Sequence, residues 1–238
     1  MARCYYEATF QGLFMCDAFD DLAILPVCVE DITILQCDPN FLLINKPARL
    51  LSVPGRHPKN RDSVIARLLP DFPNAAIVHR LDFDTSGIMV IPLNKKSLSQ
   101  ISKQFQARST NKIYTAVVNG LIEKNTGVID LPIAPDMDNR PKYKICTETG
   151  RQSVTEFTVV SRDEIAHTSR VLLHPITGRS HQLRLHMKAI GHPILGCEFY
   201  ADEIALRKSS RLLLHATELE FEHPTNSTRV LGVCNPTF

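Results

Sequence analysis

The chain of 238 residues lacks tryptophan, and aromatic residues make up only 7% of it. Leucine, isoleucine and valine must therefore supply most of the packing, within an apolar fraction of 44% that suffices for a sizeable core. The sequence has no run of about 18 apolar residues, so we expect no membrane-spanning helix. Its first residues also lack a basic start followed by an apolar stretch, and we expect no secretory signal.

Paired cysteines are missing as well. The chain has seven cysteines, but no two of them form a CxxC pair. An odd, scattered set argues against a disulfide framework and favours reduced thiols in a cytoplasmic protein. His181 and His186 are five positions apart, a spacing that separates them by roughly 140° on a helix. We therefore expect no metal site.

Charge is unevenly distributed, although the net charge is only +2. Residues 1–45 carry seven acids against one base, whereas residues 85–122 and 165–197 carry no acid at all. The two acid-free windows contain lysines and arginines, and the second also contains five histidines. This pattern indicates a local anionic partner, and nucleic acid is the usual one. From charge alone, a solvated charged face is an equally good interpretation.

Hydrophobic periodicity predicts one α+β domain around a mixed, mostly antiparallel sheet flanked by helices. Residues 1–30 show weak periodicity, and we expect an arm there, followed by a catalytic domain over 31–238. The expected strands are 32–37, 41–45, 87–93, 112–120, 153–161, 170–176 and 211–224. The expected helices are 62–69, capped by Asp62, then 96–107, and a third that begins after a cap at Ser180.

The most unusual segment is His79-Arg80-Leu81-Asp82-Phe83-Asp84-Thr85-Ser86-Gly87, which leads into an apolar strand. It places an imidazole, a guanidinium, two carboxylates and two hydroxyls within nine residues. Polar loops at strand entrances are where a rigid scaffold tends to hold functional groups. An ordinary turn capped by its Asp and Ser residues is the alternative, and these residues alone do not choose between Asp82 and Asp84.

Three segments carry a resemblance to a known family. HRLDFDTSG matches the HRLDxxTSG motif of the RluA-type pseudouridine synthases, KIYTAVVNG resembles their active-site tyrosine strand, and ITGRSHQLRLH resembles their active-site arginine segment. The likeness begins near residue 31 and leaves 1–30 without a counterpart. NKPARLLSVPG, RPKYKIC and GHPILGCEFY are most similar to the small members that modify both ribosomal and transfer RNA.

The resemblance implies a pseudouridine synthase fold with a catalytic cleft across the sheet. It implies that Asp82 is the catalytic carboxylate, Tyr114 the active-site aromatic residue and Arg184 the basic partner of the carboxylate. Asp84 falls at a variable motif position, which indicates a turn or cap. Without the motif, Arg184 would be interpreted as a surface arginine. The resemblance also implies that Arg80 fills the gap left by an extruded base. The other candidate RNA contacts are His79, Arg140, Lys142, Lys144 and Arg179.

The implied reaction breaks the bond between uracil N1 and the ribose, turns the base and rejoins it through C5. No water enters and no electron moves, so we expect neither a metal nor a redox cofactor. One carboxylate suffices to stabilise or trap the positive sugar carbon, and the sequence leaves open whether it instead removes a proton. We expect a monomer acting on 23S rRNA and the tRNA anticodon stem-loop. The alternatives are an RNA-binding protein without catalysis and a glycosidase-like hydrolase using Asp84.

Overall fold

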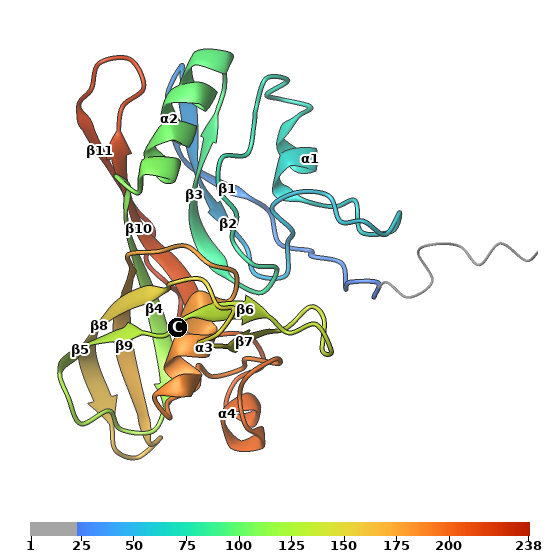
Figure 1. The fold of residues 1–238 in the computed structure, drawn as a ribbon. Coiled ribbons are helices and arrows are strands. Elements are labelled where there is room, and N and C mark those ends of the chain that lie inside the picture. Colours follow the sequence, from blue (N-terminus) through green and yellow to red (C-terminus); the bar gives the residue numbers. More distant parts are fainter. Residues whose placement is uncertain (1–22) are drawn as a thin grey trace, which may run out of the picture.

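The computed structural model describes residues 23–238, which form one curved nine-stranded sheet and a separate two-stranded hairpin (Figure 1). The strands are β1 Thr33–Cys37, β2 Phe41–Lys46, β3 Ser86–Pro92, β4 Asn111–Asn119, β5 Thr126–Asp130, β6 Ile133–Pro135, β7 Tyr143–Ile145, β8 Val154–Asp163, β9 Thr168–Pro175, β10 Leu214–Glu222 and β11 Arg229–Val233. The sheet order is β1-β2-β3-β10-β4-β9-β8-β5, with β11 also paired to β10. The strands pair antiparallel throughout this sheet except for β3 with β10.

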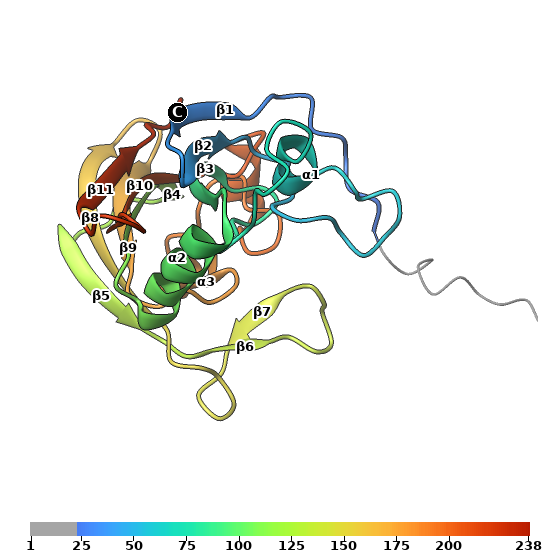
Figure 2. The same cartoon turned by 90° about the horizontal axis from the view of Figure 1, so that it is seen from above.

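The helices are α1 Val64–Leu68, α2 Lys95–Ala107, α3 Gln182–Ala189 and α4 Glu203–Arg207. Figure 2 shows α2 and α3 on the same side of the curved sheet, with the β6–β7 hairpin (residues 133–145) projecting beyond them. A mixed, mostly antiparallel sheet with few helices confirms the predicted α+β class. Within residues 23–238, no helix has the length and apolarity that a membrane crossing requires.

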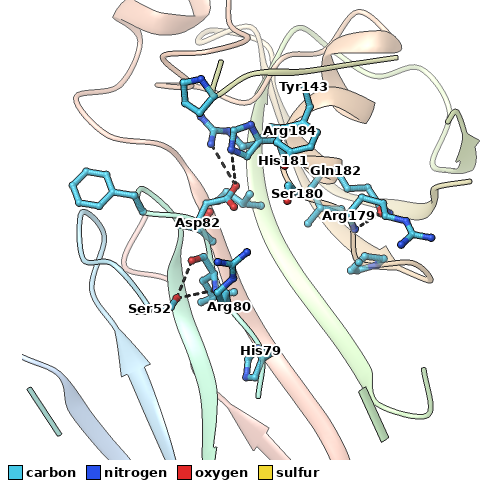
Figure 3. Close-up of a pocket in the computed structure, with 18 of the residues that line it drawn as sticks. Ser52, His79, Arg80, Asp82, Tyr143, Arg179, Ser180, His181, Gln182 and Arg184 are labelled. Atoms are coloured by element: carbon cyan, nitrogen blue, oxygen red, sulfur yellow. Dashed lines mark hydrogen bonds and ion pairs between the residues drawn. The ribbon is translucent and has the colours of Figure 1, made fainter. Parts of the chain in front are cut away.

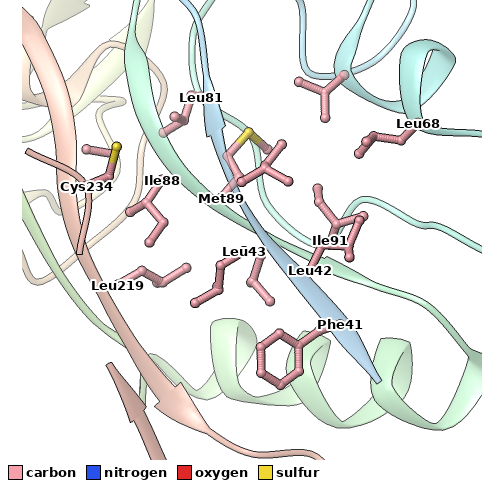
Figure 4. Packing of buried hydrophobic residues seen from close by; sticks show 14 of the residues in the cluster. Phe41, Leu42, Leu43, Leu68, Leu81, Ile88, Met89, Ile91, Leu219 and Cys234 are labelled. Atoms are coloured by element: carbon pink, nitrogen blue, oxygen red, sulfur yellow. The ribbon is translucent and has the colours of Figure 1, made fainter. Parts of the chain in front are cut away.

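Two apolar clusters lie on either side of the middle of the sheet. The first packs β2 and β3 against both N-terminal helices, and Phe41 and Met89 are fully buried in it (Figure 4). The second packs β4, β8 and β9 against α3 and includes the fully buried Met187. Tyr114 on β4 contacts both clusters. The predicted active-site tyrosine therefore lies at the junction of the two halves.

The parallel pairing of β3 with β10 depends on Gly87. Its φ of +119° is a conformation that side chains rarely adopt, and a Cβ there would lie 2.3 Å from the Ala216 carbonyl oxygen. Gly87 pairs with Ala216 in the register of the two strands. Because Asp82 lies only five residues earlier, this close backbone approach also fixes where the HRLD loop (residues 79–82) leaves the sheet.

Two predicted helix caps are wrong. Ser63, and not Asp62, caps α1 by accepting a hydrogen bond from the Ala66 amide, because Asp62 is drawn into an ion pair with Arg67. Ser180 does not cap α3 either: His181 occupies the N-cap position in a left-handed conformation, without a side-chain cap. The sequence interpretation also missed β5, β6, β7, β11 and α4.

The expected arm over residues 1–30 lies largely outside the described residues, which begin at 23. Residues 23–30 contain no helix or strand, but they are held against the domain. Arg67 donates hydrogen bonds to the carbonyls of Cys28 and Glu30. The Asn60 side chain donates to the Ala23 carbonyl and accepts a hydrogen bond from the Leu25 amide. This part of the expected arm is therefore tied to the domain surface.

We predict that Gly87→Ala destabilises the protein by about 3 kcal/mol or more, because the added methyl group collides with β10 backbone and cannot be relieved by a rotamer change. Urea unfolding measures the loss. Gly178→Ala is the control, since a Cβ there meets nothing within 4 Å, and its unfolding midpoint should stay near that of wild type. Equal midpoints for the two variants would contradict the prediction.

Candidate active site

A cleft of about 1130 Å³ lies between the HRLD loop, β4, the start of α3 and the β6–β7 hairpin. It brings together eight predicted site residues from distant parts of the sequence, namely His79, Arg80, Asp82, Tyr114, Arg140, Lys142, Arg179 and Arg184. Lys144, the ninth, does not line the cleft and pairs with Asp136 at 3.6 Å. Among the described residues, the cleft thus contains one carboxylate and several cationic and aromatic side chains.

Asp82 and Arg184 form an ion pair at the centre of this cleft. Arg184 Nη1 lies 3.4 Å from Asp82 Oδ2 (Figure 3). The aspartate side chain is 31% exposed, whereas that of Arg184 is only 2% exposed. Arg184 is therefore a buried partner of the carboxylate, and its interpretation as a surface arginine is wrong.

The Arg184 guanidinium is surrounded by groups that favour its charge. Its Nε donates to the Cys197 sulfur at 3.2 Å, and its plane contacts the rings of Phe199 and Tyr200, with centroids at 5.0 and 5.4 Å. Burial opposes the charge, but Cys197 and Asp82 outweigh it and raise the pKa of Arg184. Its Nη2 is buried and has no partner among the described residues.

Side-chain hydrogen bonds hold the backbone on both sides of Asp82. Ser52 Oγ donates to the Leu81 carbonyl at 2.9 Å and accepts from the Leu81 amide at 3.1 Å (Figure 3). Lys46 Nζ donates to the Phe83 carbonyl at 3.3 Å and to two further carbonyls. Burial lowers the pKa of Lys46 to about 7. These bonds hold the Asp82 carboxylate at a fixed place in the cleft wall.

Asp84 is in a different environment from Asp82. It belongs to the turn after Asp82 and lines a second, smaller cavity of about 450 Å³ together with Arg49 and Glu198. Burial, with Glu198 and Asp82 nearby, raises the pKa of Asp84. Asp84 does not line the main cleft, which agrees with its expected place in a turn. Asp82 lines both cavities, whereas Asp84 lines only the smaller one, and this distinguishes two carboxylates that the residues alone could not.

Tyr114 faces the main cleft from β4. Burial, reinforced by the negative charge of Asp82, raises the pKa of Tyr114 well above its ordinary value. The phenol is therefore protonated at neutral pH. It can offer a flat ring to a base and a hydroxyl to a proton relay, but it cannot act as a preformed tyrosinate.

The first two residues of the HRLD loop differ sharply. The His79 ring stacks on Phe105 with centroids 4.6 Å apart, and its Nε2 accepts from the Val90 amide at 3.1 Å. Burial lowers the pKa of His79 to about 3, so the ring is neutral and does not offer a cation to phosphate. Arg80 is exposed and makes no hydrogen bond or ion pair with any residue in the described range.

Comparison with known proteins identifies the family. A family model described as RNA pseudouridylate synthase matches residues 40–189. The dual-specificity RNA pseudouridine synthase RluA of Yersinia pestis is 49% identical over 205 residues, covering 86% of this chain and 99% of the relative. Its counterpart in Escherichia coli strain K12 is 48% identical over 193 residues, covering 81% and 88%. The chain belongs to the RluA-type RNA pseudouridine synthases.

Solved structures agree with this family assignment. Human RNA pseudouridylate synthase domain containing 1 superimposes with a TM-score of 0.76 at 29% identity, covering 90% of this chain and 86% of that one. Human RNA pseudouridylate synthase domain containing 4 superimposes with a TM-score of 0.68 at 26% identity, covering 86% of this chain and 89% of that one. The predicted pseudouridine synthase fold is thereby confirmed. The protein is an isomerase that converts uridine to pseudouridine in RNA.

Sequence reasoning missed the groups of this synthase that surround the two charged residues. Lys46, Ser52 and Cys197 were given no role, and their contacts join segments far apart in the chain. His181 was considered only as a metal ligand, yet its Nε2 lies 3.9 Å from Asp82 Oδ2. The signal that could have found Lys46, Ser52 and Cys197 is that they lie in NKPARLLSVPG and GHPILGCEFY, two segments that resemble the family.

We predict that Ser52→Ala destabilises the synthase by about 2 kcal/mol or more, because both backbone polar groups of Leu81 lose their buried partner. The modification rate should fall with it, since the HRLD loop is freed. Unfolding and single-turnover kinetics measure the two effects. Ser99→Ala on the exposed face of α2 is the control, and no difference between the two variants would contradict this role of Ser52.

Proposed function

We propose that this synthase isomerises uridines in structured loops of both 23S rRNA and the tRNA anticodon stem-loop, with Asp82 as its catalytic carboxylate. The observation that carries the proposal is the Asp82–Arg184 ion pair at 3.4 Å in a cleft wide enough for an extruded nucleotide. The relatives that are 48–49% identical to this chain are named dual-specificity RNA pseudouridine synthases. A shared loop shape, recognised after the bases splay out, would allow one site to serve two RNAs.

In the proposed reaction the bond between ribose C1′ and uracil N1 breaks with its electron pair on the base. Asp82 stabilises the positive C1′ or bonds to it through a carboxylate oxygen. The base then turns and C5 bonds to C1′, which breaks the Asp82–C1′ bond where one has formed. The C5 proton leaves and N1 is protonated. The atoms of the product equal those of the substrate, so the reaction needs no cofactor.

Two neighbours of Asp82 complete the catalytic set. Tyr114 is a neutral phenol that keeps its hydroxyl proton, and the detached uracil stacks on its ring while the base turns. Arg184 keeps the carboxylate charged beneath a bound base, where desolvation would otherwise favour its protonation. The fixed guanidinium fork suits this role better than an ammonium group does.

RNA binding is assigned to the rim of the cleft. Arg80 is exposed beside Asp82, and its planar guanidinium would replace the extruded base in the stack. His79 would support this loop as a neutral ring on Phe105. The phosphate contacts that we propose are Arg140, Lys142, Lys144 and Arg179. The projection of the β6–β7 hairpin beyond the sheet supports this placement (Figure 2).

The catalytic unit is assigned to residues 31–238. All candidate groups for catalysis come from this one chain, which supports action as a monomer. The localisation that we propose is the cytoplasm, where both RNA substrates are made and where scattered cysteines remain reduced.

The first prediction from the proposed function concerns Asp82→Asn, which keeps the side-chain shape but removes the charge. Tritium release from uridine-5-labelled RNA should fall by at least about 10³-fold, or roughly 4 kcal/mol of barrier. RNA binding should persist. Asp84→Asn, outside the main cleft, is the matched control and should keep most activity.

Both an anticodon stem-loop and a 23S rRNA fragment are tested. Full activity of Asp82→Asn would contradict the assignment of Asp82 as the catalytic carboxylate. Binding by wild type without release on either RNA would favour the non-catalytic alternative, and free uracil would indicate a hydrolase.

The second prediction concerns the hairpin. The double variant Arg140→Ala, Lys142→Ala should weaken RNA binding. It should also make the negative slope of log K against log salt shallower, by about one per lost phosphate contact. The single-turnover rate at saturating enzyme should stay near wild type. Lys124→Ala, exposed and away from the cleft, provides the control. An unchanged slope would remove the hairpin from the RNA interface.

A further inference from the structure

His181 stands beside the reacting carboxylate but has no role in the function proposed above. It is the N-cap residue of α3, with φ +56° and ψ +14°. Non-glycine residues adopt this left-handed conformation rarely, and such residues gather at functional sites. The side chain of His181 is mostly buried, and its ring lies 5.3 to 5.6 Å from the rings of Tyr143, Phe199 and Tyr200. The ring is therefore held in one orientation.

Hydrogen bonds determine which ring nitrogen of His181 carries the proton. Tyr200 Oη accepts from the Tyr143 amide at 2.9 Å and lies 2.6 Å from His181 Nδ1. The Tyr200 phenol keeps its proton at neutral pH, because burial raises its pKa to about 12. Within residues 23–238, Nδ1 is the acceptor that this hydroxyl meets. Donation from this hydroxyl to Nδ1 places the proton of the neutral imidazole on Nε2.

That Nε2–H group faces Asp82. Nε2 lies 3.9 Å from Oδ2, the same oxygen that Arg184 Nη1 approaches at 3.4 Å (Figure 3). Burial lowers the pKa of His181 and keeps the ring neutral beside the Arg184 charge. Both donors address Oδ2, and Oδ1 has no hydrogen-bond partner in the described part of the chain.

We infer that His181 is a positioning residue for Asp82: the chain Tyr143 N–H, Tyr200 Oη and His181 Nδ1 fixes an Nε2–H donor that, with Arg184, holds Oδ2 and directs Oδ1 to the ribose carbon. The inference rests on the proposed catalytic role of Asp82. A movement of about 1 Å closes the 3.9 Å separation to hydrogen-bond length when the nucleotide fills the cleft. No proton is transferred, since His181 orients an oxygen and does not react.

Two amide variants separate the two ends of the imidazole. His181→Asn keeps an acceptor near the Nδ1 position but loses the donor toward Asp82. His181→Gln places an amide donor near the Nε2 position. The same two substitutions at His167, an exposed histidine with φ +51°, control for the effect of the left-handed backbone on stability.

With 5-tritiated anticodon stem-loop RNA, His181→Asn should lower the single-turnover rate about 10- to 100-fold, the range expected for one hydrogen bond to a charged group. His181→Gln should recover the rate to within about threefold of wild type, and RNA affinity should be unchanged in both. A wild-type rate for His181→Asn, or an equal loss in both variants, would overturn the inference.

Imidazole ¹⁵N NMR of the RNA-free protein gives a second readout that needs no substrate. It should show the His181 proton on Nε2, and Tyr200→Phe should produce a mixture of both tautomers. A proton on Nδ1 in wild type would overturn the inference. If wild type fails to modify the RNA, or Asp82→Asn remains active, the proposed function fails. The tautomer result distinguishes that failure from failure of the positioning role of His181.

Discussion

The buried charge of Arg184 is the constraint on which the rest of the site depends. A guanidinium cannot lose its proton under physiological conditions, and a buried ion without partners destabilises a fold by several kcal/mol. The molecule meets this demand with a carboxylate, a sulfur and two aromatic faces, contributed by Asp82, Cys197, Phe199 and Tyr200. Because Asp82 precedes β3 in one half and Arg184 lies on α3 in the other, the charge is satisfied only when the halves meet.

The junction between the halves is made rigid by backbone contacts. Gly87 lets β3 and β10 approach so closely that no side chain fits between them, and Ser52 and Lys46 hold the residues on either side of Asp82. A carboxylate placed by such contacts is oriented before substrate arrives, and orientation supplies much of the catalytic advantage of an enzyme. The HRLD loop has no regular secondary structure, but these contacts fix the conformation of its backbone.

The sequence predicted the parts of the fold that rest on local pattern. Long alternating strands such as β4 and the amphipathic helix α2 were found, and the family motif indicated Asp82 as the candidate catalytic carboxylate. What it could not predict depends on contacts between distant segments. The strands β6 and β7 have three residues each, too few for periodicity to register. The burial of Arg184 also has no local signature, since its partners lie elsewhere in the chain.

The protonation states in the cleft share one physical cause. Burial keeps His79 and His181 neutral and Tyr114 protonated, so Asp82 and Arg184 form the charged pair at its centre. A hydrolase needs a second carboxylate that activates water, whereas an isomerisation returns the same base to the same sugar. Asp84 does not line the main cleft, and Asp82 is the carboxylate that residues 23–238 contribute to it. The arrangement of charges therefore suits a reaction in which the leaving group is also the returning nucleophile.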